Sequence, residues 1–328
     1  METQDGAELC FPQLFNTSCR KLTSPLFEVL LIHILLSSIC LITVALNLLV
    51  IISVSHFRQL HTPTNILLLS LAVADFLVGL VVMPAESIRN TTCWFLGDIV
   101  CSLYNYLSAI VTVASVGNMM LISFERYVAI CDPLHYTTRI TVNRVKFCVY
   151  LCWLYSVSYS IFFAKDDLTQ PGMYNSCYGE CVFIIDDIVI AVDLVLSFIV
   201  PFTVIVALYL RVFAVAVSQA RAMRSHITAV TLQHSVTPKA KKSELKAARN
   251  LGVLVVVFLI CLSPYYCLLI VGDDWVTVSS SFVIYLLYLN SCLNPVIYAF
   301  LYPWFRKAVK NIVTLQILQP GSCEANIL

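Results

Sequence analysis

The chain has 328 residues, of which 59% are hydrophobic and only 12% are charged, and its formal net charge is +1. Its mean hydropathy of +0.86 is too high, and its charge content too low, for a soluble globular protein. The composition therefore excludes that class and predicts a protein that uses lipid as its solvent.

Seven apolar runs, in chain order, approach or exceed the roughly 20 helical residues needed to cross a bilayer. They are residues 29–55, 65–85, 101–124, 147–164, 188–210, 250–272 and 275–305. We interpret them as helices, because a backbone in hydrocarbon must satisfy its own hydrogen bonds and uninterrupted runs do not alternate like barrel strands. The predicted fold is an all-α membrane protein, a single bundle of seven transmembrane helices.

Basic residues lie mostly on one side of these runs. With the N-terminus outside, 16 of the 20 Lys and Arg fall inside, so the positive-inside rule predicts an extracellular N-terminus and a cytoplasmic C-terminus. The outer side then holds 13 of the 19 acidic residues and a formal charge of −9. Such a field concentrates cations at the entrance, although the same acids could serve only to solvate the loops.

Other outer features fit this orientation. Two glycosylation sequons, at Asn16 and Asn90, both fall outside. Six of the 14 cysteines lie at or beyond the outer edge, where thiols oxidise, but their spacing leaves many pairings open. They are Cys10, Cys19, Cys93, Cys101, Cys177 and Cys181. The basic loop at 211–249 is either a positive loop facing lipid or part of a partner-docking surface.

Only two carboxylates lie within the seven runs, Asp75 and Asp193. A charged group at membrane depth is costly and rarely kept without a function, so these residues are the best guide to function. Asp75 is matched in depth by the oxygen-bearing residues Asn47, Ser115, Asn290, Ser291 and Asn294. One carboxylate with several neutral oxygens suits a monovalent cation or waters, and the alternative is a hydrated polar cluster that only fixes helix packing.

Short motifs occur together, each in the right helix and at the right depth. They are Asn47, Leu71-Ala72-Val73-Ala74-Asp75, Glu125-Arg126-Tyr127, Trp153, Pro201 with Tyr209, Pro264, and Asn294-Pro295-Val296-Ile297-Tyr298. The set resembles the rhodopsin-like G-protein-coupled receptors over essentially the whole chain. The resemblance implies an extracellular tail (1–26), a receptor domain with a short cytoplasmic amphipathic helix (27–311) and a cytoplasmic tail (312–328). It implies a multi-pass protein of the plasma membrane whose partner is a heterotrimeric G protein.

Finer segments are similar to the trace amine-associated receptors. They are Phe-Arg-Gln-Leu-His-Thr-Pro-Thr-Asn at 57–65, Cys177 and Cys181 around Gly179, and residues 290–295 leading to Tyr-Pro-Trp-Phe at 302–305. Members of that family respond to amines and act through stimulatory G proteins that raise cyclic AMP, many of them in olfactory neurons. The resemblance implies disulfides Cys101–Cys181 and Cys19–Cys177, leaves Cys10 and Cys93 unassigned, and implies no cofactor besides a sodium ion at Asp75.

The inner ends of the helices carry a predicted switch. Arg126 cannot lose its charge and needs an acid or carbonyls. Glu244, at the base of the sixth helix, is the expected partner, and breaking that bridge would free this helix to swing outward. Tyr209 and Tyr298 would then close on the vacated space. The alternative is that Arg126 and Glu244 each merely face the cytosol.

Two positions depart from the pattern of the class. Amine receptors usually carry an aspartate on the third helix, eighteen residues before the arginine of its motif, and this position is Ser108 here. Leu262 stands where most members have tryptophan, two residues before Pro264. We therefore expect activation to rely on Phe258 and Tyr266 instead.

Asp193 offers a replacement for the missing acid, an arrangement that some fish members of the family resemble. It lies eight residues before Pro201, a little over two turns, on the extracellular half of the fifth helix. A carboxylate there would bind an ammonium through charge-assisted hydrogen bonds. The predicted pocket is completed by Ser108, Thr112, Ser197, Tyr265, Tyr266 and Tyr288. The alternatives are a structural acid and tyrosines that only pack.

Other functions fit less well. An opsin needs a lysine in the seventh helix, and the run 275–305 has none. A transporter would show an inverted repeat or paired interrupted helices, and an enzyme would show a metal-spaced histidine cluster or a nucleophile motif. The remaining rival is a receptor for a non-amine odorant, or one without a ligand, in which Asp193 is structural.

Overall fold

The computed structural model describes residues 9–20, 26–184, 186–229, 239–271 and 276–327. Among these residues, seven helical segments are long and apolar enough to cross a membrane. They are His33–His56, Pro63–Thr91, Asp98–Cys131, Val142–Phe163, Asp187–Ser218, Gly252–Ile270 and Val283–Leu301. Each overlaps one of the apolar runs, so the prediction of an all-α bundle of seven transmembrane helices is confirmed.

The described residues form twelve α-helices in chain order. They are α1 (Leu26–His56), α2 (Pro63–Leu77), α3 (Met83–Thr91), α4 (Asp98–Cys131), α5 (Pro133–Arg139), α6 (Val142–Phe163), α7 (Lys165–Thr169), α8 (Asp187–Asp193), α9 (Val200–Ala229), α10 (Lys239–Val271), α11 (Val276–Leu301) and α12 (Pro303–Val313). Two spans are composite: a π-helical segment, Val78–Val82, joins α2 to α3, and another, Leu194–Ile199, joins α8 to α9. The composite spans contain Asp75 and Asp193, the two acids that the sequence predicts to be functional.

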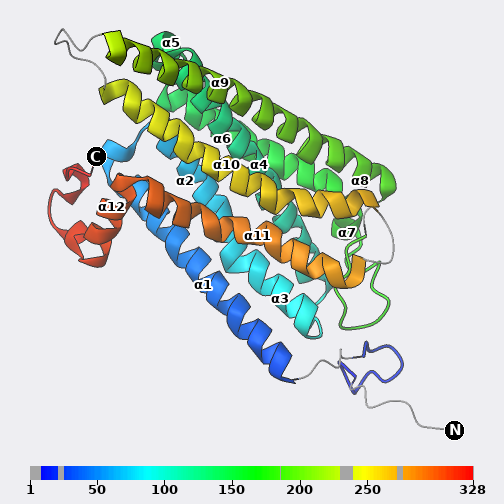
Figure 1. The fold of residues 1–328 in the computed structure, drawn as a ribbon. Helices are drawn as coiled ribbons and strands as arrows, with labels where there is room; N and C mark the ends of the chain where they lie inside the picture. The colour runs from blue at the N-terminus through cyan, green and yellow to red at the C-terminus, as the bar shows by residue number, and fades with distance from the viewer. Residues whose placement is uncertain (1–8, 21–25, 185, 230–238, 272–275, 328) are drawn as a thin grey trace.

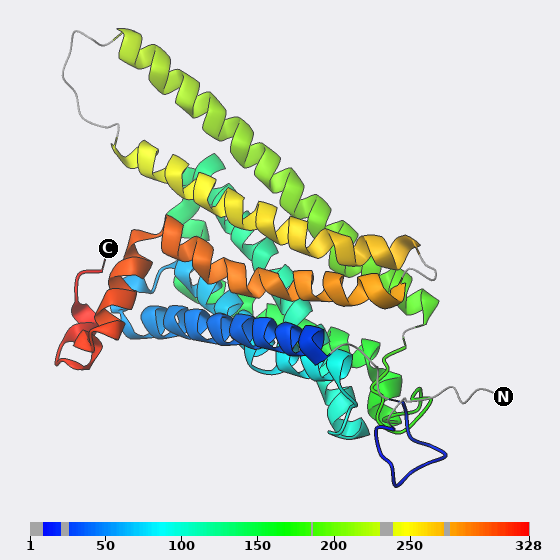
Figure 2. The ribbon, with the colours of Figure 1, turned by 60° about the horizontal axis from the view of Figure 1, so that its bottom comes forward.

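The helices run side by side, with α4 packed against α2, α6 and α9 (Figure 1). Segment 9–20 lies at one end of the bundle, here called the outer end, and α12 lies at the other, the inner end (Figure 1). Helix α9 continues past its neighbours at the inner end (Figure 2). The charge pattern of the sequence predicts that the outer end is extracellular.

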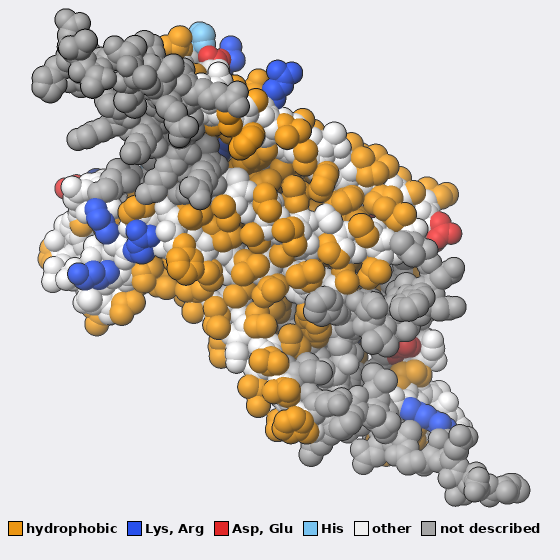
Figure 3. Space-filling model, in the orientation of Figure 1, with side chains coloured by type: hydrophobic (Ala, Val, Ile, Leu, Met, Phe, Trp, Pro, Cys, Tyr) orange, Lys and Arg blue, Asp and Glu red, His pale blue; other side chains and the backbone are white. Residues whose placement is uncertain are grey.

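The middle of the bundle presents a hydrophobic surface. Figure 3 shows this surface on one face, with Lys and Arg side chains gathered toward the inner end. Large apolar side chains such as Leu41, Phe147 and Ile260 are exposed on the helices. An apolar patch of this extent on a soluble protein would promote association, whereas a bilayer covers it without cost.

Local sequence explains how the second span begins and why it lies close to α1. The Thr62 hydroxyl accepts a hydrogen bond from the Asn65 backbone N–H at 3.3 Å and so caps α2. Pro63 suits the first turn, where its missing N–H leaves no partner unpaired. At Gly79, a Cβ atom would lie 2.8 Å from Cγ2 of Thr43, so the absence of a side chain allows the close approach.

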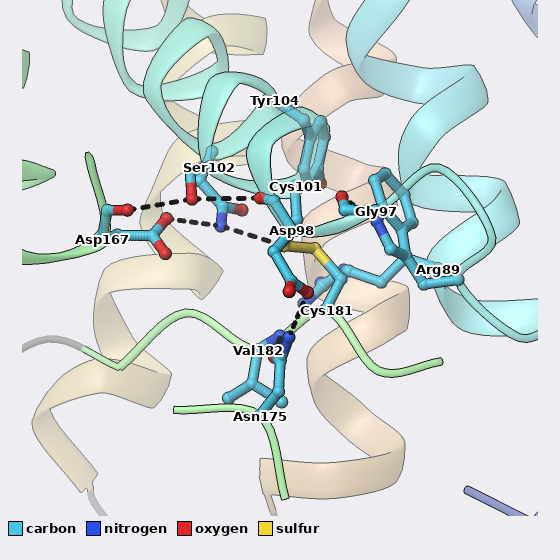
Figure 4. The surroundings of a disulfide bond; sticks show 12 residues. Arg89, Gly97, Asp98, Cys101, Ser102, Tyr104, Asp167, Asn175, Cys181 and Val182 are labelled. Atoms are coloured by element: carbon cyan, nitrogen blue, oxygen red, sulfur yellow. Dashed lines mark hydrogen bonds between the residues drawn. A yellow bond between two sulfur atoms is a disulfide. The ribbon is translucent and has the colours of Figure 1, made fainter. Parts of the chain in front are cut away.

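Three disulfides brace the outer end. They are Cys101–Cys181 (Figure 4), Cys19–Cys177 and Cys10–Cys93. The first two are the pairs implied by the resemblance, and the third joins the two cysteines that had no assigned partner. Segment 9–20 is also held by Phe11, whose ring packs against Tyr178 at a centroid distance of 5.0 Å. This segment is therefore fixed to the second outer loop, residues 164–186.

The chain after α12 folds back onto the first inner loop. Ile327 is buried in the cluster that contains Phe57, and its backbone N–H donates to Oε1 of Gln59 at 3.2 Å. Arg58 and Glu324 form an exposed ion pair at 3.6 Å. The segment 312–328, expected to be a tail, is thus packed against the bundle as far as residue 327.

Candidate ligand-binding site

Asp193 is the last residue of α8, at the point where the fifth span enters its π-helical segment. The Tyr159 hydroxyl, from α6, donates a hydrogen bond to Oδ1 of Asp193 at 3.1 Å. Ser197 and Tyr266 also lie in hydrogen-bonding contact with this carboxylate. None of the ion pairs found within the described part of the chain includes Asp193. Among the described side chains, this half-buried carboxylate thus has hydroxyl partners and no cation.

Aromatic rings surround this carboxylate. Tyr266 is 2% exposed and stacks on Phe198 at a centroid distance of 4.6 Å, while Tyr265 meets it edge-on at 5.2 Å. On α6, Tyr159 packs against Phe163 at 5.0 Å. Sequence reasoning named Tyr265 and Tyr266 but missed Tyr159, although its i, i+4 spacing to Phe163 marks one aromatic face of a helix.

A cavity of 160 Å³ lies at the outer ends of α6 and α8. Its lining is mainly aromatic and acidic: Phe162, Phe163, Lys165, Asp166, Asp167, Tyr174, Phe183, Ile184, Asp186 and Val189. Phe163 also packs against Tyr159, which binds Asp193, so the cavity adjoins the Asp193 site on its outer side. Acids and aromatic faces are groups that attract cations.

Across the bundle, Ser108 and Thr112 lie on α4 and face α11. The Ser108 hydroxyl is 2.9 Å from the Tyr288 hydroxyl, and Thr112 donates to the Ser108 carbonyl at 2.8 Å. Tyr265 interacts electrostatically with Asp193, Glu86 and Arg89. Tyr288 interacts with Glu86 and Arg89 as well. The structure thus divides the predicted pocket into two parts: Ser197 and Tyr266 at Asp193, and Ser108 and Thr112 at Tyr288.

A third carboxylate, Glu86, lies within the second span, although it was counted among the outer acids from the sequence. It is 1% exposed and accepts hydrogen bonds from Arg89 at 2.6 Å, from Asn90 at 2.8 Å and from the Tyr104 hydroxyl. A sequence signal for Glu86 exists, since eleven residues are close to three turns of an uninterrupted α-helix, at roughly 3.6 residues per turn, after Asp75. The seventh helix adds Tyr285, whose hydroxyl accepts from Asn90 at 3.3 Å.

The two sequons differ in their surroundings. Asn16 is exposed in segment 9–20. Asn90 lies in α3, and its amide nitrogen, the atom to which a glycan would attach, donates to both Glu86 and Tyr285. The geometry therefore favours Asn16 over Asn90 as a glycan acceptor.

The cluster around Asp75 combines polar residues from four helices, α1, α2, α4 and α11. Asn294 donates to Oδ2 of Asp75 at 2.8 Å, and Asn47 donates to the Ser291 carbonyl at 3.0 Å. In this cluster, four buried Oδ1 atoms find no donor among the described residues, those of Asp75, Asn47, Asn290 and Asn294. Ser115, Asn290 and Ser291 line an adjoining cavity of 20 Å³, enough for about one water molecule. This all-oxygen set, with one carboxylate, fits a small monovalent cation or ordered water.

At the inner end of α4, the guanidinium of Arg126 binds Glu125, the residue that precedes it in the chain. Its Nε donates to Glu125 at 2.5 Å, and it also donates to Thr64 of α2. Tyr136 of α5 donates to the same Glu125 carboxylate at 2.5 Å. The expected bridge to Glu244 lies outside the described side chains. The sequence motif includes Glu125, but the sequence did not predict that Glu125 is the partner of Arg126.

The other residues of the predicted switch lie on the helices to which the sequence assigned them. Tyr209 and Tyr298 have buried hydroxyls without a hydrogen-bond partner among the described residues. Tyr127 packs beside Ile130 and Val212 at the contact of α4 with α9. Phe258 and Leu262 are both buried, in α10, and line the small cavity beside the Asp75 cluster. Pro264 lies inside α10 and Pro295, next to Asn294, inside α11.

Seven spans, a polar cluster at a buried acid and an arginine at the inner end of the third span define a seven-transmembrane receptor of the rhodopsin type. The family profile "7 transmembrane receptor (rhodopsin family)" matches residues 46–298. The chain is 36% identical to trace amine-associated receptor 13c of Danio rerio, over 98% of this chain and 97% of that protein. It is 36% identical to trace amine-associated receptor 5 of Rattus norvegicus, over 99% of this chain and 96% of that protein.

Trace amine-associated receptor 4 of Mus musculus is 33% identical, over 98% of this chain and 95% of that protein. The chain therefore belongs to the trace amine-associated receptor family of G-protein-coupled receptors. It is a multi-pass membrane receptor and not an enzyme, and its class implies a heterotrimeric G protein and a ligand as partners.

Proposed function

We propose that this receptor detects amines, that the ligand ammonium pairs with Asp193, and that the signal passes through a stimulatory G protein to raise cyclic AMP. The observation that carries the proposal is the environment of Asp193: a half-buried carboxylate at membrane depth whose described partners are all hydroxyl groups. An uncompensated charge there is unfavourable, and a protonated amine would compensate it.

The surroundings of Asp193 suit an ammonium in two further ways. Tyr265 and Tyr266 offer aromatic faces, and Ser197 and Tyr159 hold the carboxylate from the side. The adjoining outer cavity carries more acidic than basic side chains, which favours the entry of cations. The relatives are named as trace amine-associated receptors, which supports an amine as the ligand class.

We also propose that the Asp75 cluster holds sodium or water in the resting receptor. Asn47, Ser115, Asn290, Ser291 and Asn294 would supply neutral oxygens, and Asp75 the charge. The orphaned Oδ1 atoms support this assignment, because buried acceptors normally have a partner. The ion would stabilise one arrangement of the helices and so oppose activation.

For activation, we propose that Arg126 is withheld from the G protein by Glu125 and Thr64, with Glu244 as the expected partner from the sixth helix. Release of Arg126 would expose its guanidinium at the inner end. Tyr209 and Tyr298 would find partners for their buried hydroxyls in the rearranged helices. Phe258 and Tyr266 would transmit ligand binding, since Leu262 offers no indole.

The test is a cyclic AMP reporter assay in cells that express the full chain, with primary and secondary amines compared with alcohols of the same carbon skeleton. Amines should activate and alcohols should not. Asp193→Asn should abolish the amine response at unchanged surface expression. Asp187→Asn is the matched control, because it removes an exposed acid from the same helix and should leave the response intact.

The alternative is a receptor for a non-amine ligand, or one without a ligand, in which Asp193 is structural. Equal responses to alcohols and amines would support it. Loss of surface expression in Asp193→Asn, with the control variant normal, would likewise assign Asp193 to folding rather than to ligand binding.

A further inference from the structure

Asp193 of α8 marks one end of the proposed ligand site, and Glu86 and Arg89 of α3 mark the other end. The two ends differ in charge. At one end, Asp193 has hydroxyl partners and no cation among the described side chains. At the other end, Glu86 and Arg89 form an ion pair at 2.6 Å. The first end can accept a positive charge, while the second is already neutral as a pair.

Glu86 has no capacity for a further cation. Its carboxylate is 1% exposed and already accepts from Arg89, Asn90 and Tyr104. A second ammonium, such as the far end of a diamine, would have to displace the guanidinium from this site. That exchange would leave Arg89 without its acid, which makes it unfavourable.

Arg89, by contrast, has hydrogen-bonding capacity left. Its guanidinium offers five N–H donors, and its bond to Glu86 uses one terminal nitrogen. Its Nε is buried and has no acceptor among the described residues. A buried donor without an acceptor is unusual in proteins, and the Arg89 side chain as a whole is 26% exposed, so its guanidinium has donors left for a group that binds there.

Tyrosines connect the two ends. Tyr265 lies within electrostatic range of Asp193, Glu86 and Arg89. Tyr288 lies near Glu86 and Arg89 as well, with its hydroxyl 2.9 Å from Ser108. Arg89 is among the residues around the Cys101–Cys181 disulfide, under the second outer loop (Figure 4). Tyr265 is thus an aromatic residue that interacts electrostatically with both ends.

The charges of Glu86 and Arg89 determine which chemical group at the far end of a ligand can bind beside them. A second ammonium is repelled by Arg89, and a carboxylate is repelled by Glu86 and by the acidic outer loops. A neutral oxygen acceptor adds no charge and satisfies the free donors of the guanidinium. An amide carbonyl is the strongest neutral acceptor of this kind.

We propose that the preferred ligand is an amine with one positive charge and a neutral hydrogen-bond acceptor, such as an amide carbonyl, at the far end of its chain. The ammonium binds Asp193 and the acceptor binds Arg89, which Glu86 holds in place. The inference rests on the proposed function, since it takes Asp193 as the ammonium site.

The experiment compares four ligand series at matched chain lengths in the cyclic AMP assay: alkyl monoamines, diamines, mono-N-acetylated diamines and ω-amino acids. At the best chain length, the acetylated diamine should act at a roughly three- to tenfold lower concentration than the monoamine, as expected for one added hydrogen bond. The diamine and the ω-amino acid should be weaker than the acetylated compound.

Variants assign the effect to Arg89. The double variant Glu86→Gln with Arg89→Met removes both charges, so no buried charge is left unpaired. It should abolish the advantage of the acetylated diamine, so that its half-maximal concentration becomes equal to that of the monoamine in the same variant. Arg20→Met, which removes an exposed basic residue of segment 9–20 at the outer end, is the control and should preserve the advantage.

The outcomes separate this inference from the proposed function. If monoamines activate the unmodified receptor but the acetylated series shows no advantage at any length, this inference is overturned and the proposed function stands. A diamine that exceeds the acetylated compound also overturns it. If no amine activates the receptor at normal surface expression, both fail. The ligand comparison needs no variant, so poor folding of the double variant leaves the test decisive.

Discussion

The hydroxyl of Tyr159 donates a hydrogen bond to Asp193 at 3.1 Å and accepts one from Ser197 at 3.3 Å. One phenol thus links the fourth and fifth spans and fixes the carboxylate on which the proposed amine site depends. The fifth span is π-helical from Leu194 to Ile199, immediately after Asp193. Such segments often occur at functional sites.

Replacing Tyr159 by phenylalanine removes the hydroxyl and keeps the ring. We expect the half-maximal amine concentration to rise about two- to tenfold, because one hydrogen bond that orients the carboxylate contributes roughly 0.5–1.5 kcal/mol. The measurement is a dose–response curve at matched surface expression. Tyr155→Phe is the control, since Tyr155 stacks on Tyr159 at 5.4 Å from an exposed position. Equal effects of both changes would argue against a special role for the Tyr159 hydroxyl.

Ser108→Asp should create a second anionic site. Ser108 lies beside Tyr288, at 2.9 Å between the hydroxyls, on the side of the pocket away from Asp193. An added carboxylate there could pair with the second ammonium of a diamine, so diamines should gain potency relative to monoamines by about tenfold. Ser108→Asn is the uncharged control. No gain for a diamine of any length would show that Ser108 and Asp193 do not share one cavity.

Glu125→Gln should raise signalling in the absence of ligand. The change weakens the hold on Arg126, which donates to Glu125 at 2.5 and 2.7 Å, and charge-assisted bonds of this kind contribute roughly 1.5–3 kcal/mol. We expect basal cyclic AMP to increase several-fold. Asp132→Asn is the control, because Asp132 pairs with His135 and Arg139 and not with Arg126. Unchanged basal signalling would mean that this pair does not restrain activation.

Glycan occupancy should differ between the two sequons. Asn16→Gln should remove the glycan-dependent shift in electrophoretic mobility, while Asn90→Gln should leave that shift unchanged, because the Asn90 amide is engaged by Glu86 and Tyr285. The measurement is mobility before and after enzymatic deglycosylation. A shift that persists in Asn16→Gln and disappears in Asn90→Gln would contradict the structure at α3.

The sequence by itself determined the class of fold and singled out two acids within it. Long apolar runs can satisfy their backbone in lipid only as helices, so seven runs were sufficient to predict seven spans. Asp75 and Asp193 stood out because a charge at membrane depth is costly wherever it lies. These conclusions depend on composition and order along the chain, and no knowledge of contacts was needed.

Only the tertiary structure decided which groups meet. Glu86 follows the second apolar run directly and reads as an outer acid, but folding buries it against Arg89, Asn90 and Tyr104. In the sequence, Tyr159 is one of several aromatic residues of the fourth helix. Only the packing of the fifth helix against it places Asp193 at the Tyr159 hydroxyl. Hydrogen bonds form over about 3 Å and depend on direction, so the rotation and the crossing angle of the helices determine which pairs form. Local sequence encodes neither the rotation nor the crossing angle.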